Sequence, residues 1–173
     1  MSNTIGTKTP YAKVIGTRQP DVSYMNRYAV RVVALNATGH VALIHAKKGD
    51  YFKLPGGGIE VDEDHGEATA REVREETGAV VSIRRSDGCV ASTEEFRNDL
   101  HQISYVYVAD VVDASGRPEL TAEELVDGLT HEWVPARQAL DKMRAVEPTS
   151  DLGRFIKERD VYLLGEVMKK LQV

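Results

Sequence analysis

The stretch from Asp64 to Gly78 constrains the fold most, because it carries both a start signal and a stop signal for one helix. Asp64 stands at the N-cap position with Glu67 three residues later, and this capping-box spacing satisfies two backbone N–H groups at the helix start. Gly78 ends the helix, since glycine adopts the left-handed conformation readily. Small residues repeat along one side of the helix, which favours packing of that side on a sheet. They are Gly66, Ala70, Val73 and Thr77.

Runs rich in β-branched and aromatic residues lie on both sides of this helix and predict a sheet. A hairpin is expected from the run that begins at Tyr28, through the turn 36–39, to the run Val41–His45. Further helices are predicted from Pro135, taken as a first helical residue, and over residues 150–171. The other strand-like runs are Tyr51–Leu54, Ala79–Arg85, Gly88–Glu94, Gln102–Val112 and His131–Val134.

These elements predict one domain over residues 1–173, of the α/β or α+β class, in which a mixed β-sheet lies sandwiched between α-helices. The length is within the range of about 100–200 residues that is usual for one domain. Residues 1–25 are polar and are expected to form an N-terminal arm or an edge strand. The terminal helix carries apolar residues at helical spacing, expected to dock on the sheet. They are Leu152, Phe155, Ile156, Leu163, Val167 and Leu171.

The charge composition limits the partners that the chain can bind. It has 22 Lys and Arg residues against 27 Asp and Glu residues, a formal net charge of −5. This balance excludes bulk electrostatic binding to a nucleic acid polymer, which requires a basic surplus. The single cysteine, Cys89, excludes a disulfide scaffold. No apolar run is long enough to span a membrane, and residues 1–10 lack the hydrophobic core of a signal peptide, so we expect a cytoplasmic protein.

Three carboxylates on the capped helix form the candidate centre of chemistry. Glu72, Glu75 and Glu76 lie at i, i+3 and i+4, so they share one helix face. This face lies roughly opposite the small-residue stripe, and we expect the acids to point outward into a groove. Acidic clusters on helices are usually solvated surface, and the spacing alone does not distinguish that interpretation from a functional one.

The wider string GGIEVDEDHGEATAREVREETGA, which starts at Gly57, resembles the Nudix box, G-x5-E-x7-R-E-U-x-E-E-x-G-U, where U is a bulky aliphatic residue. The box covers residues 57–79, and Ala79 is smaller than its usual final residue. Seven fixed matches arise by chance roughly once in ten million start sites. Residues 54–56 and 132–135 are also similar to the family around the box. The seven matches are Gly57, Glu63, Arg71, Glu72, Glu75, Glu76 and Gly78.

The resemblance implies a Nudix fold and a hydrolase, dependent on Mg²⁺ or Mn²⁺, that acts on a nucleoside diphosphate linked to another group. Magnesium prefers oxygen ligands and can activate a water while it neutralises phosphate charge. We assign Glu72 and Glu76 as principal metal ligands and Glu75 as a third ligand or a bridge through water. The family pattern adds a loop carbonyl, which falls by position at Gly56.

Other candidate residues surround this centre. Arg71 is expected to orient a glutamate, while Glu63 is expected to brace the loop or to bind a further metal ion. Lys53 is a candidate phosphate contact, and so is the backbone of Gly57 and Gly58. The general base is either a box glutamate or an acid from a distant loop. Glu119 is our choice among the distant acids, ahead of Glu123 and Glu124.

The residues beyond the box bear on substrate choice. Family members that hydrolyse ADP-ribose often carry a proline where this chain has Glu95, and dinucleoside polyphosphate hydrolases often have a tyrosine near Phe96 and Arg97. Elimination leaves a MutT-like hydrolase of (deoxy)nucleoside triphosphates or related nucleotides. The alternatives are an ADP-ribose, nucleotide-sugar or dinucleoside polyphosphate hydrolase, or a nucleotide-sensing domain without turnover. An isopentenyl-diphosphate isomerase would need a cysteine before the box. A homodimer is common among similar proteins.

Overall fold

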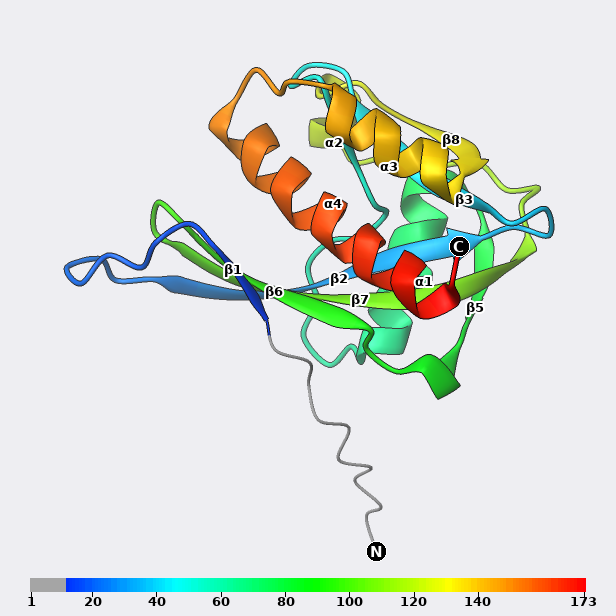
Figure 1. Cartoon of the computed structure of the whole chain (residues 1–173), viewed down its shortest axis with the longest axis horizontal. Coiled ribbons are helices and arrows are strands. Elements are labelled where there is room, and N and C mark those ends of the chain that lie inside the picture. Colours follow the sequence, from blue (N-terminus) through cyan, green and yellow to red (C-terminus); the bar gives the residue numbers. More distant parts are fainter. Residues whose placement is uncertain (1–11) are drawn as a thin grey trace, which may run out of the picture.

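A computed structural model describes residues 12–173 of the chain and shows one mixed sheet at its centre (Figure 1). The strand order is β1-β6-β7-β2-β3-β4, with β5 paired to β7 and β8 paired to β3. β2 and β7 run parallel, while β6 and β7 form an antiparallel hairpin. The strands are β1 (Lys13–Ile15), β2 (Met25–Leu35), β3 (His40–Ala46), β4 (Tyr51–Lys53), β5 (Val80–Ile83), β6 (Ala91–Arg97), β7 (Leu100–Asp113) and β8 (Leu129–Pro135).

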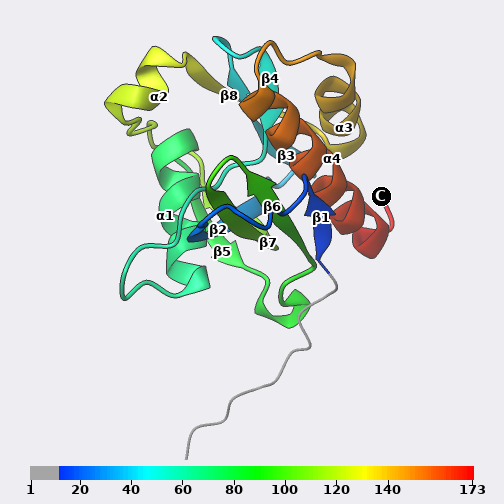
Figure 2. The same cartoon turned by 90° about the vertical axis from the view of Figure 1, so that its left-hand side faces the viewer.

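Helices cover both faces of this sheet, as the sequence predicts (Figure 2). The helix α1 (His65–Thr77) lies on one face, and the pair α3 (Ala136–Ala145) and α4 (Asp151–Leu171) lies on the other. A short helix, α2 (Ala122–Val126), precedes β8, and a 3-10 turn occupies Arg85–Asp87. The predicted mixed sheet between helices is therefore confirmed.

The alternation of β2 shows why the sheet is covered twice. Val33 belongs to the cluster that also contains Leu163 of α4, whereas Val32 packs with Val73 of α1. Successive side chains of a strand point to opposite faces, so an apolar run of this kind is buried on both sides.

The N-terminal segment is described in part. Residues 1–11, including all of the stretch 1–10 tested for a signal peptide, lie outside the described residues. From Lys13 the chain forms β1, which pairs in parallel with β6 at the end of the strand order. Among the helices of residues 12–173, none is long and apolar enough to cross a membrane.

The acids of α1 line a cavity, in line with the expected groove, but two of them are more enclosed than we expected. Glu72 and Glu76 are buried, together with Val73 and Thr77, while Gly66 and Ala70 of the small-residue stripe are only half-buried. The loop of residues 56–58 encloses these glutamates, because the Gly56 N–H donates to Glu76 and a Cβ on Gly57 would lie 2.3 Å from Glu72.

Two details near the C-terminus also differ from the sequence predictions. Pro135 ends β8 and is the N-cap of α3, so the first helical residue is Ala136. Leu152 is exposed at the start of α4, and the buried side of that helix instead includes Leu164, Met168 and a buried charged pair, Arg159 and Asp160.

Candidate active site

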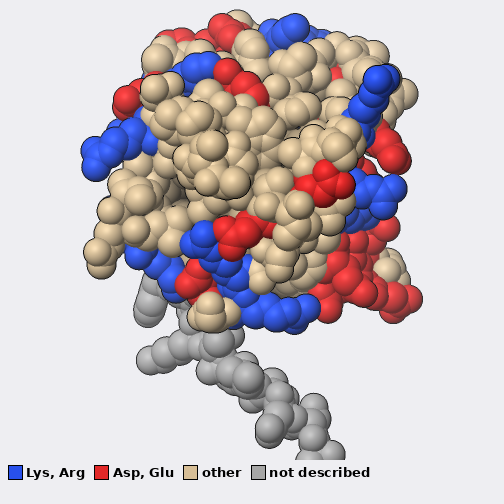
Figure 3. All heavy atoms as spheres, turned by 90° about the vertical axis from the view of Figure 1, so that its right-hand side faces the viewer, with Lys and Arg blue, Asp and Glu red and all other residues tan. Residues whose placement is uncertain are grey.

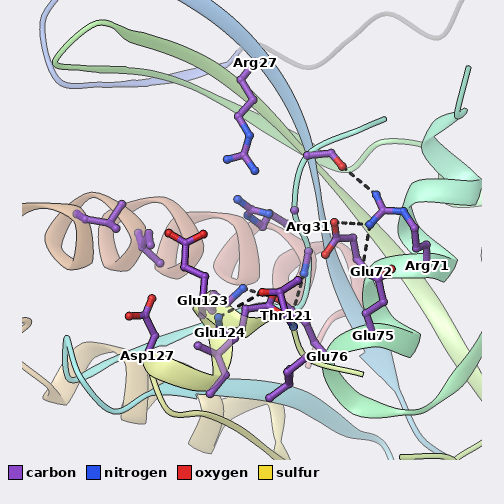
Figure 4. A pocket seen from close by; sticks show the side chains of 18 of the residues that line it. Arg27, Arg31, Arg71, Glu72, Glu75, Glu76, Thr121, Glu123, Glu124 and Asp127 are labelled. Carbon is purple, nitrogen blue, oxygen red and sulfur yellow. Dashed lines mark hydrogen bonds and ion pairs between the residues drawn. The ribbon is translucent and has the colours of Figure 1, made fainter. Parts of the chain in front are cut away.

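A cavity of about 710 Å³ opens between α1, the loop of residues 56–58, the strand β2 and the helix α4 (Figure 4). The segment of residues 119–129 closes the opposite side. Nine of the predicted site residues line this one cavity, and the tenth, Glu63, does not. The nine are Lys53, Gly56, Gly57, Gly58, Arg71, Glu72, Glu75, Glu76 and Glu119.

Capping fixes the helix that presents the glutamates. The Asp64 side chain accepts from the Glu67 N–H, and the Glu67 side chain accepts from the Asp64 N–H, both at 2.8 Å. Gly78 ends the helix with φ +78°, and a Cβ there would lie 2.5 Å from backbone atoms of Gly116. The start and the end of α1 are therefore set as the sequence predicts.

Glu76 is the most enclosed of the three acids, with 3 % of its surface exposed. Lys53 Nζ lies 2.5 Å from Glu76 Oε1, and the Gly56 N–H donates to Oε2 at 3.1 Å. Burial raises the pKa of Glu76, and the ammonium of Lys53 opposes that rise. Lys53, which we considered as a phosphate contact, is thus paired with a glutamate in this conformation.

Arg71 links the other acids to the loop. Its Nη1 donates to Glu72 at 2.8 Å and to Glu75 at 3.2 Å, and its Nη2 donates to the Gly58 carbonyl at 2.9 Å. Both oxygens of Glu63 also accept from this guanidinium, at 2.7 and 2.9 Å, and these hydrogen bonds lower the pKa of Glu63. The contacts favour a bracing role for Glu63 over binding of a further metal ion.

The loop approaches the glutamates so closely that two of its residues have no space for a side chain. A Cβ on Gly57 would lie 2.3 Å from Glu72 Oε1, and a Cβ on Gly56 would lie 2.1 Å from the Val30 carbonyl oxygen. The loop is held to β2 because the Val30 N–H donates to the Gly57 carbonyl at 3.0 Å. Gly56 and Gly57 therefore let the backbone touch both the strand and the carboxylate.

The donor set suits a hard cation by its chemistry. Carboxylates on Glu72, Glu75 and Glu76 and a loop carbonyl are oxygen ligands of the kind that Mg²⁺ prefers. Within residues 12–173, however, no three acidic, histidine or cysteine side chains lie close enough together to hold a metal ion. Arg71 and Lys53 bind the carboxylate oxygens instead. The residues fit the ion in type. An ion there would take the place of Lys53 at Glu76, while Arg71 contacts one oxygen of Glu72 and one of Glu75 and leaves the other oxygen of each.

Glu119 lies at the edge of the cavity. Its side chain is 68 % exposed and lies 3.5 Å from Arg74, while its N–H donates to the Glu75 carbonyl at 2.7 Å. Glu123 and Glu124 line the cavity from the short helix α2. The Glu124 carboxylate accepts from the Thr121 N–H in a second capping box, so α2 uses it for its own start.

The sequence interpretation missed four arginines that line the cavity: Arg27 and Arg31 of β2, Arg97 of β6 and Arg159 of α4. We call them the arginine wall. The sequence did contain a sign of this buried charge, because Arg31 interrupts an otherwise apolar run. Arg31 and Val33 are two residues apart in β2, so they point to the same face of the sheet, the one buried against α4. A charge at such a position indicates a buried polar cluster or a ligand site.

The surface outside the cavity is mixed in charge. On the face in Figure 3, Lys and Arg side chains of the described residues lie in separate groups among acidic and uncharged ones. A nucleic acid backbone needs a continuous basic track, and this face of the described chain offers none.

Comparisons with known proteins agree with the box. The NUDIX domain family model matches residues 25–151, well over half of the chain. An 8-oxo-(d)GTP phosphatase of Mycolicibacterium smegmatis is 30% identical over 121 residues, which are 70% of this chain and 35% of that protein. The chain thus spans about a third of the length of this curated relative.

Solved structures show the same fold at low identity. The MutT protein of Methanosarcina mazei Go1 aligns with a TM-score of 0.60 and 18% identity, over 88% of this chain and 99% of that chain. A C. elegans Ap4A hydrolase aligns with a TM-score of 0.58 and 15% identity, over 84% of this chain and 98% of that chain. These structures share the fold of the chain, and the family model together with the matched box shows that the chain belongs to the Nudix family.

Proposed function

We propose that the chain cleaves the pyrophosphate linkage of a small nucleotide, with Mg²⁺ as cofactor and Mn²⁺ as a possible substitute. The observation that carries this proposal is the convergence of Glu72, Glu75 and Glu76 on one cavity beside a glycine loop. A diphosphate is strongly negative and would be repelled by these carboxylates alone, so a cation between them is required.

Each residue around this centre has a proposed part. Glu72 and Glu76 hold the cation with Glu75 and the Gly56 carbonyl, and Arg71 keeps Glu72 and Glu75 in position. When bound, the cation supplies charge neutralisation and a lowered pKa for the attacking water. Lys53, released from Glu76, is placed to contact a phosphate from the same cavity. Proton removal falls to a box glutamate or to Glu119.

The proposed substrate is a (deoxy)nucleoside triphosphate or a related nucleotide. The relative from M. smegmatis, named as an 8-oxo-(d)GTP phosphatase, supports this class. ADP-ribose, nucleotide sugars and dinucleoside polyphosphates are the alternatives, together with nucleotide sensing without turnover. A cytoplasmic location and a homodimer stay predictions.

A substrate panel tests the proposal. Purified protein with Mg²⁺ is assayed for released phosphate and pyrophosphate on nucleoside triphosphates, ADP-ribose, a nucleotide sugar and a dinucleoside polyphosphate. We expect the triphosphates to have the largest kcat/KM. Higher kcat/KM values on ADP-ribose would overturn the substrate class, and no turnover of any member would favour the sensing alternative.

A further inference from the structure

Most of the acids in the cavity lie on α1 and on the segment of residues 119–127, whereas the arginine wall occupies β2, β6 and α4. The cavity is also lined by Lys53 of β4, Glu60 of the loop before α1 and Arg71 of α1. The arginine wall lies on the face of the sheet that packs on α4. In this part of the face the side chains are polar, whereas elsewhere they form the apolar core. Arg27 and Gln102 are register partners of β2 and β7, and Glu95 of β6 is opposite Gln102, so the three lie in one row.

Two members of the arginine wall have no hydrogen bond to a carboxylate among the described residues. Asp160 accepts from Arg159 Nε at 2.6 Å and from the Leu54 N–H at 2.9 Å. Glu95 accepts from Arg97 Nε at 3.0 Å and lies 3.8 Å from Arg159. Arg27 and Arg31 instead experience the charges of Glu72 and Glu76 at longer range, across the cavity.

Within residues 12–173, Arg31 lacks a hydrogen-bond partner at one buried nitrogen. It is 4 % exposed, and among the described residues its buried Nε has no hydrogen-bond partner, with Asp160 Oδ1 at 3.9 Å. Burial, with the charge of Arg159 as a further cause, lowers the pKa of Arg31 to about 10, so the guanidinium is still charged at neutral pH. A buried cation without a full partner is costly unless an anion completes it.

Arg27 of the arginine wall has an uncharged hydrogen-bond partner. Its Nη1 donates to Gln102 Oε1 at 2.8 Å, and in Figure 4 its side chain points into the cavity, toward Arg31. Gly58 lies between Arg27 and the residues that hold the glutamates. The Gly58 carbonyl accepts from Arg71 at 2.9 Å, and a Cβ on Gly58 would lie 3.2 Å from Arg27. An anion at Arg27 would thus be next to a group bound at the glutamates.

We propose that the arginine wall, together with Gln102, is a second anion subsite that binds the phosphates of the substrate beyond those held at Glu72 and Glu76. Guanidinium groups bind phosphate through paired, charge-assisted hydrogen bonds, which suits this cluster. The inference rests on the proposed function and deepens it. The subsite selects nucleotides with three or more consecutive phosphates, because a nucleotide sugar would place a neutral sugar against Arg27 and Arg31, which have no hydrogen-bonded carboxylate in the part of the chain that the structure describes.

Binding of inorganic tripolyphosphate tests the subsite without turnover. Titration calorimetry is done in buffer with a chelator, on the wild type, Arg27→Gln and Arg97→Gln, with the exposed Arg137→Gln of α3 as the matched control. We expect both wall variants to raise the Kd about tenfold, the loss of one charge-assisted contact, and the control to match the wild type. No binding by the wild type, or equal Kd values for all four proteins, would overturn the subsite. Thermal melts confirm that each variant is folded.

Kinetics separate this inference from the proposed function. The ratio of kcat/KM for dGTP to that for ADP-ribose is expected to fall about tenfold in Arg27→Gln and to stay unchanged in Arg137→Gln. An unchanged ratio in Arg27→Gln contradicts the subsite while leaving the hydrolase intact. If the wild type hydrolyses neither compound, the proposed function fails, and the tripolyphosphate titration still decides the subsite.

Discussion

Lys53 Nζ lies 2.5 Å from Glu76 Oε1, and the carboxylate in this pair is almost completely buried. The pair joins the end of β4 to the last turn of α1, and the Gly56 N–H holds the other oxygen of the same carboxylate. The lysine suggested as a phosphate contact and a glutamate suggested as a metal ligand are therefore one coupled unit. A change in either residue alters the charge that the other one faces.

Glu76→Gln tests the metal-ligand assignment. It keeps the shape of the side chain and one acceptor for Gly56, but it removes the negative charge that the cation needs. We expect kcat to fall on the order of 100-fold or more, as when an electrostatic contact at the reacting group is lost. Steady-state assays at saturating substrate measure it. The exposed Glu147→Gln is the control, and near wild-type kcat in Glu76→Gln would refute the assignment.

Gly57→Ala tests the contact between the loop and Glu72. The added Cβ would lie 2.3 Å from Glu72 Oε1, so the carboxylate or the loop must move. Displacement of about 1 Å at a reacting group costs about 100-fold in rate, and we expect a loss of that order. Gly165→Ala is the matched control, because no atom lies within 4 Å of its Cβ position in α4. It should keep activity and raise the free energy of unfolding by about 0.5–1 kcal/mol. Full activity in Gly57→Ala would contradict the contact.

Asp160→Asn tests the buried charges behind the arginine wall. The change leaves Arg159 and Arg31 without the carboxylate that faces both. Loss of one partner from a buried pair costs about 3–5 kcal/mol, which we expect as a decrease in the free energy of unfolding. Urea denaturation measures it, with the exposed Asp151→Asn as a control that should lose less than about 1 kcal/mol. Similar stability in both variants would show that the buried carboxylate is dispensable.

The Arg84–Asp110 pair predicts a pH dependence of stability. Arg84 donates to both Asp110 oxygens at 2.6 and 2.7 Å, and these hydrogen bonds lower the pKa of Asp110. The folded protein therefore binds this proton less readily than the unfolded chain, whose Asp pKa is about 3.9. The stabilisation is present above about pH 5 and is lost as the pH falls through the lowered pKa.

Asp110→Asn measures this contribution. Because the pair is half exposed and screened by solvent, we expect the variant to have a free energy of unfolding at most about 1 kcal/mol below that of the wild type at pH 7. This difference in the free energy of unfolding should shrink toward zero as the pH is lowered to about 2, because Asp110 of the wild type is then protonated and so uncharged as well. Urea unfolding at several pH values checks this, with the exposed Asp141→Asn of α3 in parallel. A deficit in Asp110→Asn that is constant with pH would rule out the ion pair as its source.

The sequence predicted the elements whose signals are local. The caps of α1 at Asp64 and Gly78 are dictated by neighbouring residues, and so are the start of α4 at Ser150 and the alternation of β2. The box glutamates share one helix face because of their spacing, and the resemblance to the Nudix box identified them as candidates. The roles assigned to them stay predictions.

The sequence did not predict features that depend on contacts between distant segments. The burial of Glu72 and Glu76 follows from a loop that is held to β2, and helix periodicity alone cannot show this. The arginine wall combines residues from β2, β6 and α4, whose common side is fixed only by strand pairing and helix docking. Arg159 appeared as one more charged residue on a helix, although it is almost fully buried.

Metal-dependent hydrolysis is tested most directly by dGTP turnover with and without a free divalent cation. Pyrophosphate and phosphate release are measured for the wild type in buffer with a chelator, and again after excess Mg²⁺ is added to the same sample. We predict no turnover above background in the chelator and full recovery with Mg²⁺, because the box carboxylates need the cation to accept a polyphosphate. Turnover that is indifferent to the chelator would contradict the account.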